Sequence, residues 1–300
     1  MTEPILRATE LTKRYGRTTA LQQLTLSIAP GEVVGLLGPN GSGKTTALRL
    51  FLGFLRATSG NVTIAGFDCW KDSVKVRRNV TYLPGELRLY ENMTGRQLVV
   101  FLNKLRGVGS SDVDALAKRL DINPDLPLTQ LSSGMKRKVA LLSVLVPKVP
   151  LLILDEPTNT LDPTMRDEFL DQIRLAKRDG KAVLFSSHVL AEVEAVCDRV
   201  VMLRKGMLVH EQDVTTLQMG RTVRATLTGT VLDAPPTGGT LSISGNQLKL
   251  DYLGELPQLL SWLQQQPISE LHIEPSSLAP IYQKFFSSCE PRTVRSERER

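Results

Sequence analysis

Short apolar runs alternate with amphipathic stretches over the first two thirds of the chain. Strand-like apolar runs occur at Glu32–Leu37, Val62–Ile64, Val80–Leu83, Leu151–Leu154, Ala182–Ser186 and Val200–Leu203. Between them, apolar positions recur with helical spacing at Thr45–Leu55, Thr94–Arg106, Lys136–Val146 and Met165–Lys177. Strands that alternate with helices predict a largely parallel, buried sheet, and therefore an α/β fold.

The two ends of the chain depart from this pattern. Ile5–Ile28 consists of short alternating segments around a turn at Tyr15–Arg17, which predicts an N-terminal antiparallel β subdomain. Beyond Gly220, small alternating runs, a loop at Asp233–Gly239 and a helical stretch at Leu256–Gln265 predict a small α+β domain, with a ferredoxin-like fold as one option. We expect a main domain over residues 1–217, a small domain over 222–286 and a disordered tail over 287–300.

The composition is typical of a globular protein. The chain is 41% hydrophobic and 23% charged, and its longest strongly apolar stretch, Val139–Val146, is far shorter than the roughly 18 residues of a membrane-spanning helix. No basic region followed by an apolar run opens the chain, so we expect no signal peptide. The net charge is +6, and part of it lies in Arg292–Arg300. We expect no nucleic-acid partner, because no aromatic residues interleave with these arginines; contact with anionic lipid is the other alternative.

A glycine-rich segment follows the apolar run Val33–Leu37 and opens a helical stretch. Gly38–Thr45 fits the phosphate-loop pattern G-x-x-x-x-G-K-[ST], in the strand–loop–helix context that the motif requires. Glycines let successive N–H groups turn inward around phosphate oxygens, and the helix N-terminus adds a favourable dipole. We expect Lys44 to reach the β- and γ-phosphates and the Thr45 hydroxyl to ligate Mg²⁺. The residues expected to bind ATP here are Gly38, Pro39, Asn40, Gly41, Ser42, Gly43, Lys44, Thr45 and Thr46.

Two acids end a second apolar run. Asp155 and Glu156 follow Leu151–Leu154 and precede Pro157. Carboxylates at the tip of a buried strand are costly unless a cation or substrate lies there, and the carboxyl ends of parallel strands face the ligand crevice. We expect Asp155 to hold Mg²⁺ through water and Glu156 to polarise the attacking water as general base. An acidic turn that caps the next helix is the alternative, and the phosphate loop makes the catalytic interpretation the stronger one.

Between these motifs, Leu131–Met135 resembles the LSGGQ signature of ABC ATPases. The segment keeps the serine and the second glycine, but has Ser133 for the first glycine and Met135 for the glutamine. Alone, it also fits a serine N-cap that starts a helix. Its order between the two motifs makes the resemblance specific. The resemblance implies a P-loop NTPase of ABC type with a helical subdomain, in which Ser132 and Gly134 bind ATP held by another protomer.

Further segments resemble the same family. Thr160–Asp162 resembles the D-loop, which crosses the dimer interface. Ser187–His188 resembles the switch histidine, which implies that His188 touches the γ-phosphate and acts with Glu156 and Lys44 in catalysis. Tyr15 precedes Gly16 and resembles the aromatic residue that stacks on adenine. A helix-capping surface histidine and an ordinary strand aromatic are the alternatives for His188 and Tyr15.

One segment departs from the family pattern. ABC ATPases usually carry a glutamine after a strand and a proline, and it couples Mg²⁺ to the transmembrane partner. Here Gly85 occupies that position, after Pro84 and before Glu86. Either Glu86 substitutes as an oxygen that faces Mg²⁺, or the role is lost. The expected metal ligands are therefore Thr45, Asp155 and Glu86.

The resemblance covers residues 4 to about 217 and extends to a subgroup. Tyr82–Tyr90, Leu131–Lys138 and Leu271–Leu278 resemble the ATPases of bacterial multidrug or antibiotic exporters whose membrane subunit is a separate chain. This implies a subunit that uses ATP and Mg²⁺ to close and open a head-to-tail homodimer against an integral membrane permease. Its expected location is peripheral, on the cytoplasmic face of the cell membrane.

Two other functions are alternatives to transport. A non-transport ABC ATPase that acts on DNA or ribosomes usually has paired ATPase halves, long coiled-coil insertions or cysteine-rich zinc modules, and the sequence contains none of these patterns. An unrelated P-loop kinase or GTPase would lack the ordered signature, D-loop and histidine. A GTPase would also need a guanine-reading N-K-x-D segment, which is absent from the sequence.

Overall fold

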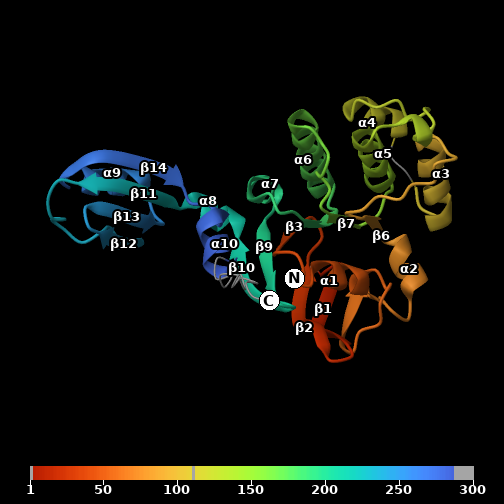
Figure 1. Cartoon of the computed structure of the whole chain (residues 1–300), viewed down its shortest axis with the longest axis horizontal. Helices are drawn as coiled ribbons and strands as arrows, with labels where there is room; N and C mark the ends of the chain where they lie inside the picture. The colour runs from red at the N-terminus through yellow and green to blue at the C-terminus, as the bar shows by residue number, and fades with distance from the viewer. Residues whose placement is uncertain (1–2, 110–111, 287–300) are drawn as a thin grey trace, which may run out of the picture. The chain divides into compact units, whose positions relative to one another are not determined.

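A computed structural model describes residues 3–109 and 112–286 of the chain. It divides into two compact units, Met1–Val214 and Thr215–Arg300 (Figure 1). The tail expected over 287–300 lies outside the described residues.

A six-stranded sheet forms the centre of the first unit. Its strands lie in the order β10-β9-β3-β8-β7-β6. Their bounds are β3 Val33–Leu37, β6 Val80–Leu83, β7 Leu151–Asp155, β8 Ala182–Ser186, β9 Arg199–Arg204 and β10 Met207–Asp213. All neighbours pair in parallel except β10 and β9, which pair antiparallel. Every residue of β3, β7 and β8 is buried, because a parallel sheet is covered on both faces. The predicted parallel sheet is confirmed, while β10 was not predicted.

A second, antiparallel sheet contains the N-terminal hairpin. Its order is β2-β1-β4-β5, with bounds β1 Leu6–Tyr15, β2 Thr18–Ile28, β4 Ser59–Ile64 and β5 Phe67–Asp68. The predicted antiparallel subdomain is confirmed. The apolar run at Val62–Ile64 forms part of β4, which joins this sheet and not the parallel one. A tight turn at Ala65 and Gly66, both with positive φ, leads directly from β4 to β5, and no crossover helix is present to make them parallel.

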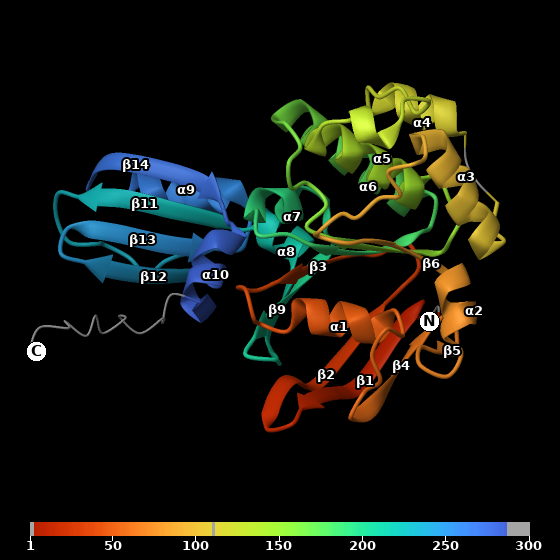
Figure 2. The ribbon, with the colours of Figure 1, turned by 45° about the vertical axis from the view of Figure 1, so that its right-hand side comes forward.

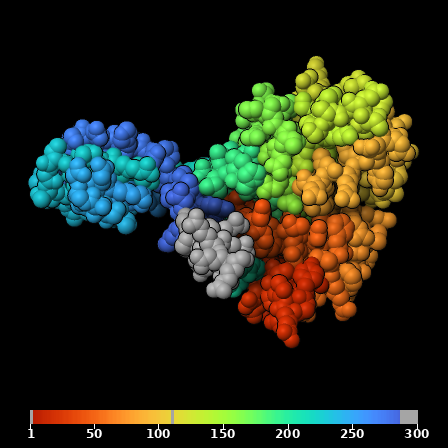
Figure 3. Space-filling view, viewed as in Figure 1, coloured from red at the N-terminus to blue at the C-terminus, as the bar shows by residue number. Residues whose placement is uncertain are grey.

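Helices cover both faces of the central sheet. Their bounds are α1 Lys44–Phe51, α2 Ser73–Arg78, α3 Gly95–Arg106, α4 Val113–Arg119, α5 Ser133–Leu145, α6 Pro163–Arg178 and α7 Leu190–Val196. The short helix α8, Val214–Met219, begins at the last residue of the first unit and continues into the second. Figure 2 shows α3, α4, α5 and α6 on one side of this sheet, and α1 with the antiparallel sheet on the other. Figure 3 shows the surface of the same segments, with α3 and α4 in yellow and the hairpin in red. The order of strands and helices produces a helical subdomain, as the resemblance implied.

Side-chain caps define several helix ends in this unit. Thr94 forms a capping box with Gln97 at the start of α3, and Asp162 accepts a hydrogen bond from the Met165 amide at the start of α6. The Ser132 hydroxyl accepts a hydrogen bond from the Met135 amide, 3.3 Å away, and so caps α5. The helix predicted from Lys136 therefore begins earlier, at Ser133.

The second unit is a small antiparallel sheet with two helices. The strands are β11 Arg221–Leu227, β12 Gly239–Ser244, β13 Gln247–Tyr252 and β14 Ile268–Pro275, in the order β12-β13-β11-β14. Helices α9 and α10 span Leu256–Gln264 and Leu278–Phe286. The core joins the inner sheet face, including Leu250 and Tyr252, to Leu259 and Trp262 of α9. The unit is α+β, but it is not ferredoxin-like, because no helix separates β11 from β12.

Candidate nucleotide site

The phosphate loop lies between β3 and α1, as its pattern predicted. Two of its glycines are required by close packing. A Cβ on Gly38, whose φ is 152°, would lie 2.4 Å from the Leu203 carbonyl oxygen. A Cβ on Gly43, whose φ is 109°, would lie 2.8 Å from the Ala20 carbonyl oxygen. The neighbouring strands therefore hold the loop so tightly that only glycine fits at either position.

Two side chains of this loop have groups suited to a phosphate. The Lys44 ammonium donates hydrogen bonds to the carbonyls of Gly38 and, at 3.2 Å, of Pro39. Burial lowers the pKa of Lys44, and the nearby Glu156 and Asp155 carboxylates oppose that shift. The Ser42 hydroxyl is buried and has no hydrogen-bond partner among the residues that the structure describes. An orphaned buried hydroxyl beside a lysine fits an anion held within the loop.

The acids of the second motif lie at the tip of β7, next to the tip of β8. Ser186 ends β8 and its hydroxyl donates to the Asp155 carboxylate at 2.6 Å, while the Glu156 amide donates to the Ser186 hydroxyl at 3.0 Å. Burial raises the pKa of Asp155, and the Ser186 hydrogen bond lowers it. Glu156 has a φ of 48°, an uncommon backbone conformation for a residue other than glycine. One serine thus orients both acids.

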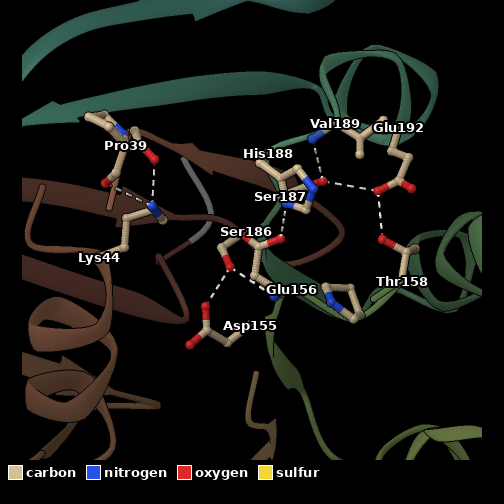
Figure 4. Close-up of polar contacts among 12 residues, drawn as sticks. Pro39, Lys44, Asp155, Glu156, Thr158, Ser186, Ser187, His188, Val189 and Glu192 are labelled. Carbon is tan, nitrogen blue, oxygen red and sulfur yellow. Dashed lines mark hydrogen bonds and ion pairs between the residues drawn. The ribbon is translucent and has the colours of Figure 1, made fainter. Parts of the chain in front are cut away.

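The Glu156 side chain reaches across to the segment after β8. Its Oε2 lies 2.6 Å from Nδ1 of His188 (Figure 4). The His188 side chain is largely exposed, whereas Glu156 is mostly buried. A hydrogen bond to this imidazole orients a carboxylate whose other oxygen remains available to water.

A second polar network lies directly behind His188. Glu192 of α7 is buried, and its Oε2 accepts hydrogen bonds from the hydroxyls of Ser187, at 2.9 Å, and Thr158, at 2.8 Å (Figure 4). The Ser187 hydroxyl also accepts a hydrogen bond from the Val189 amide. Glu192 therefore ties the segment after β7 to the segment that carries His188.

One cavity of about 1080 Å³ joins the two motifs. Its lining includes the phosphate-loop residues Pro39–Thr46, the acids Asp155 and Glu156, and Glu86. The structure thus brings together most of the residues predicted for the site. It adds residues that the sequence did not single out, namely Thr18, Thr19, Arg49, Arg88, Asn159 and Lys205.

The donors in this cavity fit Mg²⁺ only together with a phosphate. Thr45, Glu86 and Asp155 all line it and offer the oxygen ligands that Mg²⁺ prefers. Within residues 3–109 and 112–286, no group of three or more His, Cys, Asp or Glu side chains could hold a metal ion by itself. Mg²⁺ typically binds through one or two carboxylates, water and substrate phosphates, so this donor set suits a nucleotide-bound ion.

Four predicted ATP contacts lie outside the lining of the cavity, one of them Gly38 at the start of the phosphate loop, and the predicted catalytic residue His188 also lies outside it. Tyr15 is exposed at the end of β1, with the Lys13 ammonium 5.0 Å from its ring centroid. Ser132 and Gly134 lie at the start of α5, and neither lines the cavity. A Cβ on Gly134 would lie 3.3 Å from the Thr160 carbonyl oxygen, so the signature-like and D-loop-like segments are neighbours.

Sequence patterns did not identify the supporting residues of the site. Ser186, Glu192 and Thr158 act through side-chain contacts between segments about thirty residues apart. Arg137 was also missed, although a cation inside the otherwise apolar face of the predicted helix at Lys136–Val146 was a usable signal. The structure buries Arg137 almost completely, with its guanidinium beneath the tip of β7.

Comparison with known proteins gives a consistent family assignment. A family profile described as ABC transporter matches residues 21–159. An uncharacterized ABC transporter ATP-binding protein, YdbJ of Bacillus subtilis, is 38% identical over 215 residues, which are 70% of each chain. The linearmycin resistance ATP-binding protein LnrL of the same organism is 32% identical over 213 residues, 68% of each chain.

A solved structure agrees with these matches. The structure of an ATP-binding subunit of an ABC transporter superposes with a TM-score of 0.67 at 26% identity, covering 71% of this chain and 92% of that one. None of the helices within the described part of the chain is both long enough and apolar enough to cross a bilayer.

Proposed function

Because this chain belongs to the ABC transporter family of ATP-binding proteins and is an ATPase, we propose that it powers an exporter by closing and opening a homodimer against a separate membrane subunit. The observation that carries the proposal is the contact between Glu156 and His188 at a cavity that the phosphate loop also lines. A general base must lie within hydrogen-bond reach of the proton that it takes, and a neighbouring group must orient it. This pair supplies both parts.

The residues of the cavity form two groups, one that binds ATP and Mg²⁺ and one that hydrolyses ATP. The phosphate loop holds the triphosphate through its amides, with Lys44 and Ser42 at the phosphate oxygens. Thr45 and Asp155 hold Mg²⁺, with Glu86 as a further oxygen, and the ion neutralises phosphate charge when bound. Glu156 takes the proton of the attacking water, and His188 fixes the orientation of Glu156 and contacts the γ-phosphate.

A second copy of the chain completes each site. Ser132 and Gly134 lie outside the cavity of their own protomer, which supports their binding the nucleotide of a partner. The D-loop-like segment Thr160–Asp162 is next to Gly134 and would lie in the same interface. Closure of the dimer would exclude bulk water and place the signature dipoles against the γ-phosphate.

The membrane subunit would dock on a groove between α1, α2 and α3. The groove has a volume of about 370 Å³ and an apolar lining that includes Phe54, Val74 and Leu105, each more than half exposed. Tyr82 lines both this groove and the nucleotide cavity, so a partner here would contact the segment Tyr82–Tyr90 that leads into the site. Docking on an integral membrane permease would make the chain a peripheral protein of the cytoplasmic face.

The proposal also includes the direction of transport and the role of the second unit. LnrL is named for resistance to linearmycin, which supports export for this chain. We assign the ATP-binding domain to residues 1–217, and a dimer-stabilising or regulatory role to the small domain over 222–286. Removing residues 222–300 tests that role, and unchanged dimerisation and ATPase activity would refute it.

The decisive experiment for the proposed function uses the Glu156→Gln variant. Size-exclusion chromatography with light scattering would follow it with and without ATP·Mg²⁺. The substitution removes the base and keeps the nucleotide contacts, so we expect ATP to convert a monomer into a stable dimer. The matched control combines Glu156→Gln with Ser132→Arg, which obstructs the signature and should prevent dimerisation. A Glu156→Gln variant that binds ATP and stays monomeric would contradict the sandwich mechanism.

A further inference from the structure

Arg137 is a buried cation whose surroundings are unusual. It lies on α5, two residues after the signature-like segment Leu131–Met135, and only 2% of it is exposed. Every hydrogen bond that the structure gives its guanidinium, within the described residues, goes to a backbone carbonyl. Burying a guanidinium is costly, and here the carbonyls of two loops compensate for the loss of water.

The carbonyls belong to two segments at the ends of the neighbouring strands β6 and β7, and both segments line the nucleotide cavity. On one side, Nη1 donates to Pro84 O at 3.0 Å and Gly85 O at 3.2 Å. On the other, Nε donates to Pro157 O at 2.9 Å, and Nη2 donates to the carbonyls of Asp155 and Glu156. The planar fork of an arginine can serve both segments at once, which the single ammonium of a lysine cannot do.

The first of these segments is where the sequence departs from its family. Gly85 occupies the position of the usual glutamine and has no side chain to reach the metal site. Its backbone lies close to the acids, since a Cβ on Gly85 would be 3.8 Å from Oδ2 of Asp155. The connection between the loop and the acids therefore runs through Arg137 and the backbone.

The second segment contains the strained residue of the site. Glu156 has a positive φ, and such a conformation persists only where the surrounding structure holds it. Arg137 holds the Glu156 carbonyl, and the Ser186 hydroxyl holds its amide. Both ends of this residue are thus fixed while its carboxylate points to His188.

We propose that Arg137 is a positioning residue that joins the Pro84–Gly85 loop to the catalytic end of β7 through hydrogen bonds to their backbone carbonyls. The inference rests on the proposed function, because it takes Glu156 as the general base. It also gives α5 a second task. The helix that carries Ser132 and Gly134 at its start fixes the Glu156 backbone from its second turn. Binding of Ser132 and Gly134 to a partner's nucleotide is therefore coupled to the alignment of Glu156.

The test compares Arg137→Lys and Arg137→Gln with the wild-type chain. Lys138→Gln is the matched control, since it removes a charge from the next position, where the lysine donates to the Asp121 carbonyl and pairs with the Asp121 carboxylate. We expect kcat to fall by about tenfold to a hundredfold in both Arg137 variants, because a small misplacement of a catalytic group has effects of that size. The affinity for a fluorescent ATP analogue should stay within about threefold of wild type, and Lys138→Gln should match wild type in both measurements.

A second readout separates positioning from a general loss of structure. Positioning acts through Glu156, so adding Arg137→Lys to a Glu156→Gln background should leave the residual single-turnover rate unchanged. The proposal is overturned if kcat of the Arg137 variants stays within about twofold of wild type, or if Lys138→Gln loses as much activity as they do. A further loss of rate in the Glu156→Gln background would also overturn it. Loss of the folded state in both Arg137 variants would overturn it as well, because Arg137 would then contribute to stability alone. If wild type hydrolyses ATP and Glu156→Gln dimerises, a silent Arg137 removes only this inference. If neither occurs, the proposed function fails instead.

Discussion

The phosphate loop and the tip of β7, which the tip of β8 supports, lie at the same cavity but are built in different ways. The loop is a continuous segment, Gly38–Thr46, and two glycines fixed by steric contact give it its conformation. The strand tips depend on side chains from distant segments, which hold two acids and a histidine in place. The loop is thus organised by backbone and the tips by a polar network. We therefore expect that substitutions can disturb nucleotide binding and hydrolysis separately.

The largest expected effect belongs to the strand tips. Replacing Glu156 with glutamine removes the proposed base, and general-base catalysis contributes about a hundredfold to ten thousandfold in rate. We expect kcat to fall by that amount while the affinity for ATP stays near wild type, measured by phosphate release and by binding of a fluorescent analogue. A parallel loss of affinity would mean that the two regions are not separable.

The second largest effect concerns the phosphate loop, and it should appear in the affinity for ATP. Lys44→Ala removes the ammonium proposed to bind the phosphates, and a hydrogen bond to a charged group contributes about 1.5–3 kcal/mol. This corresponds to about a tenfold to hundredfold weaker affinity for ATP, measured by titration calorimetry. Arg56→Ala is the control, since Arg56 is a basic residue that does not line the cavity. Unchanged affinity in Lys44→Ala would remove Lys44 from the binding site.

The same difference explains what could be predicted from the sequence. The central sheet and the hairpin follow from local patterns, because buried parallel strands form continuous apolar runs and a half-buried hairpin alternates. The phosphate loop and the paired acids are contiguous and carry their chemistry in the residue types. The short helix α7 and the edge strand β10 were missed, since neither forms a long periodic pattern.

The supporting residues of the strand tips could not be predicted in this way. Ser186 and Asp155 are 31 residues apart, and Glu192 and Thr158 are 34 residues apart, so only the folded sheet shows that they meet. A serine or threonine also carries no signal of its own, because most such residues are exposed. The predicted contacts of Tyr15, Ser132 and Gly134 with ATP depend on the nucleotide and on a second chain, and they stay predictions.

A pair of glycine substitutions tests whether steric contact holds the phosphate loop in its conformation. Gly38→Ala would place a Cβ against the Leu203 carbonyl in a backbone conformation that alanine rarely adopts, and we expect it to lower the free energy of unfolding by about 3 kcal/mol. Gly85→Ala meets only ordinary contacts, at 3.8 Å and beyond, and should change that free energy by less than about 0.5 kcal/mol. Urea denaturation measures both, and equal values would show that the loop is not held by close packing.

The smallest effect tests whether the polar network behaves as one unit. Thr158→Val and Ser187→Ala each remove one of the two hydroxyls that donate to Oε2 of Glu192, and each should lower the free energy of unfolding by about 1–2 kcal/mol. The double variant leaves a buried carboxylate with neither donor, so its loss should exceed the sum of the single losses by about 0.5 kcal/mol or more. Pairing Thr158→Val with Thr226→Val, in the second unit, provides an additive control. Additivity in the Thr158–Ser187 pair would mean that the two hydroxyls act independently, and that Glu192 does not link the segment after β7 to the segment that carries His188.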